Sequence, residues 1–146
     1  MAVTSEHGLH QRREAVVREH VAAENRQDVE ATIETFDRPR YEVNGESHDG
    51  ERAVRDLLQG MVGGFPDFHA EVEKVYHADN VVIGEARITG THNGPFAGIP
   101  PTGRRVNYTM AAFFFEFEED RLMCEKVYFD TATILRQIGV LPDEPE

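Results

Sequence analysis

The chain has 146 residues, of which 40% are hydrophobic and 29% are charged, a composition typical of one globular domain with a single core. Its 27 acidic and 15 basic residues give a formal net charge of -12, which would repel nucleic acid and an anionic membrane surface. Cys124 is the only cysteine, which excludes an internal disulfide and an ordinary zinc-thiolate cluster. No apolar run resembles a signal peptide or a membrane span, so we expect a cytoplasmic protein. We expect residues 1–146 to form one domain, ordered from about 5 to 140, with a short acidic tail.

The N-terminal part predicts two helices. Ser5 is suited to cap a helix that runs to about Asn25. Apolar side chains and one histidine recur in it at helical spacing: Leu9, Val16, Val17, His20, Val21 and Ala23. Asp28 predicts a second cap, for a short helix over 29–36 that ends before Pro39.

A strand and a third helix are expected next. Residues 40–44, "RYEVN", read as a short strand, and residues 45–50, "GESHDG", as a loop. Over 51–62 the apolar residues recur at i, i+1, i+4, i+5 and i+8, which predicts an amphipathic helix that Gly63 and Gly64 end.

Beyond Gly64 the apolar period changes from about 3.6 to about 2. Four strands are predicted, over residues 68–76, 81–91, 106–117 and 122–129. Asp130 is suited to cap a last helix that ends at Gly139. Helices followed by strands with short connections indicate an α+β fold: a cone-shaped curved antiparallel sheet packed on the N-terminal helices. Such a cone has a pocket inside it and a mouth built from loops.

One loop is unusual in composition. Half of the residues from Gly90 to Gly103 are glycine or proline, and the segment "THNGPFAGIPPTGRR" holds neither a phosphate-loop nor a metal-ligand pattern. Prolines restrict the chain and glycines permit positive φ. We therefore expect a semi-rigid rim between two strands, with Phe96 and Ile99 folded over the cone.

Several separated motifs carry a family resemblance. "GTHNGPFAGIPPTGRRV" after "DNVVIGEARIT", with "GFPDF" upstream and "FDTATILRQIG" downstream, resembles the SnoaL-like polyketide cyclases, or ester cyclases, of the nuclear transport factor 2-like superfamily. The resemblance extends from the first helix to Gly139. It implies a cone-shaped α+β barrel, a homodimer formed through the sheet, and an intramolecular aldol ring closure that uses no metal or organic cofactor. It also implies that Asp130, just ahead of the last helix, is the acid/base.

The chemistry sets conditions on that carboxylate. Removing a proton next to a carbonyl requires a base stronger than an exposed aspartate, so we expect aromatic surroundings to raise the pKa of Asp130. The alternative is that Asp130 only caps the last helix. His92 is the expected donor to the developing oxyanion, since it ends a strand at the rim; the alternative is a structural histidine bonded to the loop.

Further residues are expected to contact the substrate. These residues are Tyr108, Tyr128, Phe65, Phe114, Phe96, Ile99 and Arg104. Each aromatic could instead be core, and Arg104 could instead form a surface ion pair. Tyr41 and His48 are weaker candidates. No histidine of the predicted sheet matches the second catalytic residue of the founding cyclases.

A metal site was also considered. His20 and Glu24 have the i, i+4 spacing of metal ligands, but neither an HExxH nor a CxxC pattern accompanies them, so we expect a solvated helix face and no metal. The predicted function is cofactor-independent acid/base chemistry of a cyclase, lyase or isomerase type on a small apolar carbonyl or polyketide-like molecule. A hydrolase or dehydratase in the same cone, a protein that only binds a hydrophobic ligand, and a dimeric scaffold are the alternatives.

Overall fold

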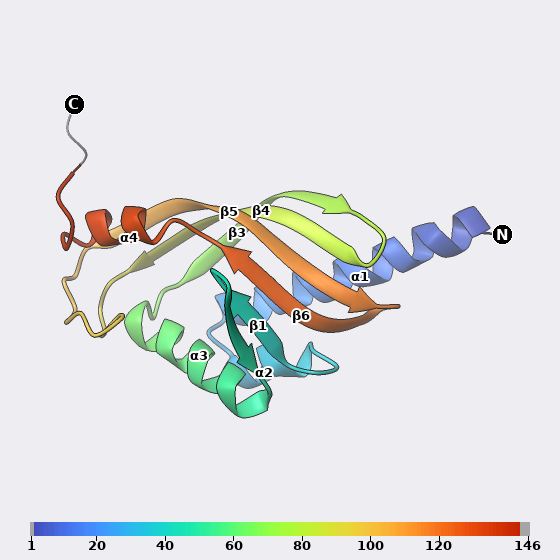
Figure 1. Ribbon diagram of the computed structural model, residues 1–146, viewed down its shortest axis with the longest axis horizontal. Coiled ribbons are helices and arrows are strands. Elements are labelled where there is room, and N and C mark those ends of the chain that lie inside the picture. The colour runs from blue at the N-terminus through green and yellow to red at the C-terminus, as the bar shows by residue number, and fades with distance from the viewer. Residues whose placement is uncertain (1, 144–146) are drawn as a thin grey trace.

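The computed structural model describes residues 2–143, and their side chains except at 2–5 and 110–111. Figure 1 shows the resulting α+β architecture, in the order of helices and strands that the sequence predicts apart from one additional strand. The elements are α1 (Ala2–Asn25), α2 (Val29–Glu34), β1 (Arg40–Val43), β2 (Glu46–Asp49), α3 (Glu51–Gly64), β3 (His69–His77), β4 (Val81–Thr91), β5 (Arg105–Glu118), β6 (Arg121–Tyr128) and α4 (Thr131–Gln137). No helix within the described residues is both long enough and apolar enough to cross a membrane. The last residues of the predicted acidic tail, 144–146, lie outside the described part.

The six strands form one sheet in the order β2-β1-β6-β5-β4-β3. The expectation of a purely antiparallel sheet is wrong, because β1 and β6 pair in parallel, with Tyr41 opposite Glu125. The chain leaves β1 for the opposite edge of the sheet and returns through the β3-β4-β5-β6 meander, so that β6 arrives beside β1 in the same direction. This pairing joins the N-terminal and C-terminal halves of the fold.

The additional strand is β2, which lies in the segment predicted to be a loop. Asn44 and Gly45 form a two-residue turn with φ values of 48° and 86°, and Val43 pairs with Glu46 across it. Positive φ at both turn residues is the type I′ pattern that asparagine followed by glycine favours, so the missed hairpin has a local cause.

The sheet curves around one face of the molecule. Its register shifts between Val72 and Lys74, between Gly84 and Ala86, and between Glu116 and Phe117, and such bulges bend a strand. Figure 1 shows α1, α2 and α3 on one side of this curved sheet, with α4 at the end where β4 and β5 are connected. The helices and the concave face therefore enclose the core.

Capping residues fix two of the helix starts, as predicted. The Asp28 carboxylate accepts a bond of 3.0 Å from the backbone N–H of Ala31 at the start of α2, and Asp130 accepts from Thr133 at the start of α4. The first helix begins at Ala2, ahead of the predicted cap at Ser5, whose side chain lies outside the described set.

One buried arginine closes the end of the fold opposite α4. Arg13 of α1 is 4% exposed, and its guanidinium donates to the carbonyl oxygens of Asp79 and Glu119 at 2.8 and 2.6 Å. These carbonyls belong to the β3-β4 and β5-β6 turns, and the ring of Phe117 lies 5.6 Å from the guanidinium carbon. Arg13 thus ties two hairpin turns to α1.

Candidate active site

A cavity of about 420 Å³ lies between the helices and the concave face of the sheet. This volume is within the range of small-molecule sites. Its wall is mainly apolar, with side chains from α1, α3 and every long strand, for example Val21, Leu57, Val72, Ile88 and Phe113. The polar residues on its wall are Glu24, Tyr41, Asp56, Thr89, Tyr108 and Glu125.

The loop of residues 92–104, called the rim loop below, contributes Pro95, Phe96 and Ala97 to the cavity wall. Phe96 and Ile99 exchange two backbone hydrogen bonds of 3.1 and 2.8 Å across a tight turn, in which Ala97 and Gly98 have φ values of 49° and 78°. The backbone N–H groups of residues 93 and 94 donate to the Gly64 carbonyl oxygen at the end of α3. The rim loop is therefore anchored beside the cavity, as its composition predicts.

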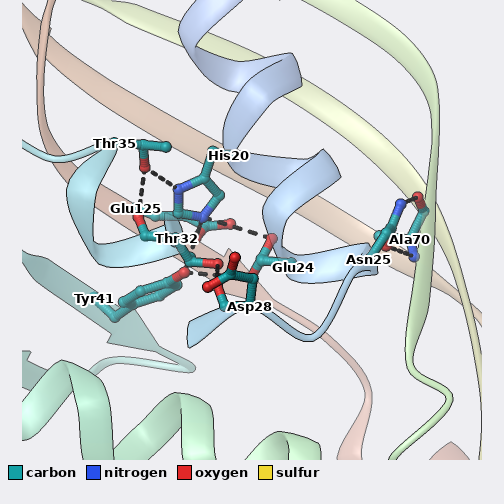
Figure 2. Close-up of polar contacts among 9 residues, drawn as sticks. All are labelled: His20, Glu24, Asn25, Asp28, Thr32, Thr35, Tyr41, Ala70 and Glu125. Atoms are coloured by element: carbon teal, nitrogen blue, oxygen red, sulfur yellow. Dashed lines mark hydrogen bonds and ion pairs between the residues drawn. The ribbon is translucent and has the colours of Figure 1, made fainter. Parts of the chain in front are cut away.

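A buried polar cluster of His20, Glu24, Tyr41 and Glu125 forms one part of the wall (Figure 2). His20 Nε2 lies 2.9 Å from the Tyr41 hydroxyl, 2.9 Å from Glu125 Oε2 and 3.5 Å from Glu24 Oε1. The Tyr41 hydroxyl donates to Glu24 Oε2 at 3.3 Å. His20 is fully buried behind the other three, which are at most 9% exposed and line the cavity.

Two features of the fold bring this cluster together. His20 and Glu24 are four residues apart on α1, so they share one helix face. Tyr41 and Glu125 are register partners in the parallel pair of β1 and β6. The ring contacts of His20 with Phe36 and Phe115 surround it with apolar groups. Polar groups in such surroundings require hydrogen-bond partners, which the cluster supplies internally.

Burial and mutual charge change the proton affinities of the cluster. Burial and the charge of Glu125 raise the pKa of Glu24 to about 8, against the opposing effects of His20 and of the hydrogen bond from Tyr41. Burial lowers the pKa of His20, but the charges of Glu125 and Glu24 and the hydrogen bond to Glu125 outweigh it, so that pKa is raised. Burial and the two carboxylates raise the pKa of Tyr41 well above its ordinary value. Near neutral pH, Glu24 is thus mainly a carboxylic acid and Tyr41 a phenol, and the raised pKa of His20 favours its imidazolium form.

The same cluster has the composition of a cation site. One ligand atom each from His20, Glu24 and Glu125 lie within 4.8 Å of one another. Each of the three side chains is, however, already engaged in a hydrogen bond or an ion pair within the cluster. These hydrogen bonds and ion pairs account for how the side chains are arranged.

The chain matches the SnoaL-like polyketide cyclase family over residues 14–138, from α1 to the residue after α4. This protein belongs to the SnoaL-like polyketide cyclase family. Among proteins with curated functions, none has a sequence that matches this chain.

Three solved structures illustrate where this SnoaL-like protein stands. The candidate hydroxylase AclR of Streptomyces galilaeus is 27% identical, with 92% of this chain and 85% of that chain covered and a TM-score of 0.79. The candidate polyketide cyclase IdmH of Streptomyces antibioticus is 24% identical, with coverages of 87% and 98% and a TM-score of 0.71. An NTF2-like protein of unknown function from Burkholderia pseudomallei K96243 is 16% identical, with coverages of 88% and 98% and a TM-score of 0.73. The nuclear transport factor 2-like fold is therefore confirmed, and these neighbours differ in the chemistry ascribed to them.

Asp130 does not lie in the cavity of this SnoaL-like domain. Its side chain is exposed and accepts hydrogen bonds from the backbone N–H and the hydroxyl of Thr133, at 3.3 and 2.8 Å. These bonds lower the pKa of Asp130, so the predicted rise of that pKa is wrong. The alternative role, a cap on α4, accounts for both hydrogen bonds from Thr133.

His92 and Arg104 also lie away from the cavity wall. His92 is fully buried, its Nδ1 accepts from the backbone N–H of Thr102 at 3.2 Å, and its ring stacks on Phe65. His92 therefore supports the rim loop from behind Phe65. Arg104 is exposed, and its guanidinium packs close to Gly139.

The residues predicted to bind substrate divide into two groups. Phe65, Phe96 and Tyr108 line the cavity, where their contact with a substrate stays a prediction. Tyr128, Phe114 and Ile99 are not part of the wall. Tyr128 is 42% exposed and touches Phe114 edge to face, because alternation along β5 and β6 turns both rings away from the concave face. Ile99 is partly buried and packs against the hydrophobic core.

Sequence reasoning missed the centre of the site. The expectation that His20 and Glu24 lie on a solvated helix face is wrong, since both are buried. The signal was present, because His20 falls within the apolar repeat of the first helix. The sequence favours Tyr108 and Tyr128 over Tyr41 and gives no signal for Glu125, because the β1-β6 pairing that joins Tyr41 to Glu125 leaves no local pattern.

Proposed function

We propose that this SnoaL-like protein catalyses proton transfer at a carbon next to a carbonyl group, with side chains of its own as acid and base. Glu24 is the general acid, Tyr41 is a second hydrogen-bond donor, and Glu125 is the carboxylate base, held by His20. The observation that carries the proposal is that two carboxyl groups, those of Glu125 and of Glu24 with its pKa raised to about 8, lie within one buried cluster on the cavity wall.

The cavity also favours a class of substrate. Its wall is largely apolar, and among the described residues no lysine, arginine or histidine lines it, whereas Glu24, Asp56 and Glu125 do. An anionic group entering the cavity would lose its hydration without meeting a cation. The substrate is therefore an uncharged, mostly apolar carbonyl compound of a size suited to about 420 Å³.

The proposed steps balance in atoms and electrons. Glu125 takes the proton of the C–H bond beside the carbonyl, and the bonding electron pair moves into the enol. Glu24 gives its proton to the carbonyl oxygen while the Tyr41 hydroxyl donates a hydrogen bond to it. In a ring closure, the enol carbon then attacks a second carbonyl of the same molecule. The new alkoxide receives the proton from Glu125, and the enol proton returns to Glu24.

The same pair of groups also suits the elimination of water. Glu24 would protonate a departing hydroxyl while Glu125 removes a proton from the neighbouring carbon. Mass spectrometry of the product separates the two reactions, because an aldol ring closure alone leaves the mass unchanged and an elimination removes one water molecule.

The first reaction step can be tested without the natural substrate. Benzoylacetone is an uncharged aromatic diketone, and loss of its α-proton signal in deuterated water, followed by NMR, reports proton abstraction. We expect the protein to accelerate this exchange, and Glu24→Gln and Glu125→Gln each to reduce the acceleration by about 10²-fold or more. Tyr41→Phe should cost about tenfold.

Asp130→Asn is the matched control, because it changes a carboxylate that lies outside the cavity. It should leave the exchange rate unchanged. Full exchange activity in Glu24→Gln, or its loss in Asp130→Asn with the fold intact, would contradict the assignment.

We also propose a homodimer formed through the outer face of the sheet. Phe114, Tyr128 and Tyr76 supply aromatic surface on this side of the strands, and the last two are 42% and 50% exposed. Light scattering after gel filtration should give twice the mass of the chain, and Phe114→Glu should give the monomer mass. A monomeric wild type would refute the dimer.

A further inference from the structure

Thr35, at the C-terminal end of α2, contacts His20 on the ring nitrogen opposite Nε2 (Figure 2). Its hydroxyl oxygen lies 2.6 Å from the Thr32 carbonyl oxygen and 2.7 Å from His20 Nδ1. A carbonyl oxygen only accepts hydrogen bonds, so a contact of 2.6 Å requires the hydroxyl proton between the two oxygens. That proton is then committed, and the proton in the contact with His20 must come from Nδ1.

The other ring nitrogen obeys the same rule. With a proton fixed on Nδ1, a neutral imidazole would present the lone pair of Nε2 to Glu125 Oε2 at 2.9 Å. The contact therefore needs one more proton, on Nε2 or on Glu125. The ionisable groups that face His20 are Glu24 from α1, Tyr41 from β1 and Glu125 from β6, while its contacts with Phe36 and Phe115 are between rings.

We propose that Thr35 is a positioning residue: by holding one proton on Nδ1, it requires His20 to be an imidazolium whenever Glu125 is ionised. The inference rests on the proposed function, because it concerns the charge beside the proposed base. Without the hydroxyl, the ring can carry its single proton on Nε2, where a neutral imidazole satisfies Glu125. The cluster then loses one positive charge, and Glu24 becomes harder to ionise when it gives its proton to the carbonyl oxygen.

Thr35→Val removes the hydroxyl and keeps the shape, and Thr35→Ser keeps the hydroxyl as the matched control. Long-range proton–nitrogen NMR of protein labelled at histidine shows which ring nitrogens are protonated, and His20→Asn identifies the His20 signals. Near pH 7 we expect both nitrogens of His20 to be protonated in the wild type and in Thr35→Ser. In Thr35→Val we expect a single proton, on Nε2.

A doubly protonated His20 in Thr35→Val would overturn the inference. A wild-type His20 with one proton, on Nε2, would do the same even if Thr35→Val does not fold. In the benzoylacetone exchange assay, Thr35→Val should lower kcat about tenfold with little change in KM, and Thr35→Ser should stay near the wild type.

The two proposals fail in different ways. If Glu24→Gln keeps full exchange activity, the proposed function fails, whereas the protonation pattern of His20 still decides the effect of Thr35. If the pattern changes as expected and kcat does not, Thr35 sets the charge of His20 but is not a positioning residue for the reaction.

Discussion

Replacing Glu24 with glutamine should change how both activity and stability depend on pH. With a pKa of about 8, Glu24 is protonated in roughly ten molecules for every one in which it is ionised at pH 7. The exchange rate of benzoylacetone should therefore fall above pH 8, approaching tenfold per pH unit as the acid form is lost. Glu24→Gln cannot transfer a proton, so its residual rate should be about 10²- to 10⁴-fold lower and should lack this falling limb.

Glu24→Gln should have opposite effects on activity, which it lowers, and on stability at high pH, which it raises relative to the wild type. The unfolded chain releases the Glu24 proton near the ordinary value of 4.5, whereas the folded protein keeps it up to about 8. The folded state thus binds the extra proton within this window, and the stability linked to it is lost as the pH rises through the folded pKa. The difference between 4.5 and about 8 corresponds to on the order of 5 kcal/mol.

Urea unfolding at pH 5, 7 and 9 measures this difference. The wild type should lose stability relative to Glu24→Gln as the pH rises, so that the less active variant is the more stable one at pH 9. The raised pKa of His20 acts in the same direction, and the part of it that comes from the Glu24 charge is absent from the variant, so the comparison measures Glu24 together with its effect on His20. Parallel stability curves for the two proteins, or a falling activity limb that persists in the variant, would refute the assignment of Glu24.

Three further pairs of substitutions test the assignment of structural and functional roles. Asp130→Ala should lower the free energy of unfolding by about 1 kcal/mol and leave exchange activity unchanged. Asp28→Ala, at the other helix cap, should have the same effect on stability. A loss of activity in Asp130→Ala would restore Asp130 as a catalytic residue. Arg13→Met removes two hydrogen bonds of a buried guanidinium and should lower the free energy of unfolding by about 2–4 kcal/mol. Arg12→Met, at an exposed ion pair, should change it by about 0.5 kcal/mol or less. Equal effects of the two variants in urea unfolding would contradict the role of Arg13. Phe96→Ala should raise KM for benzoylacetone about tenfold with kcat nearly constant, and Ile99→Ala should not; an unchanged KM in Phe96→Ala would place the substrate away from the rim loop.

Local chemistry explains why much of the fold was predictable. Asp28 and Asp130 cap the helices that follow them, and the change of apolar period after Gly64 marks the passage from helices to the sheet. The β2 hairpin was missed although Asn44 and Gly45 carry its turn signal. The parallel pairing of β1 with β6 could not be predicted in the same way, because it joins segments that are far apart in the sequence.

The site was less predictable for the same reason. His20 and Glu24 form a visible pair on α1, but only the β1-β6 pairing places Tyr41 and Glu125 against it. The rim loop and the last helix carry the stronger sequence signals, and these led to His92 and Asp130. Both are structural in their contacts: His92 braces the rim loop and Asp130 caps α4. Here the conspicuous motifs coincide with a tight turn and a helix start, and neither His92 nor Asp130 lines the cavity.

Two buried polar residues of α1, Arg13 and Glu24, differ in what their side chains contact. Arg13 is buried as deeply as Tyr41, yet its guanidinium contacts turn carbonyls and the ring of Phe117, at the end of the fold away from the rim loop. Glu24 faces the cavity, and its raised pKa means that the fold disfavours its charge, a cost that an apolar side chain would not bear. Hydrogen bonds to Glu24 explain how that cost is tolerated, and its place on the wall of an apolar cavity is the arrangement that the proposed proton transfer to a bound molecule requires.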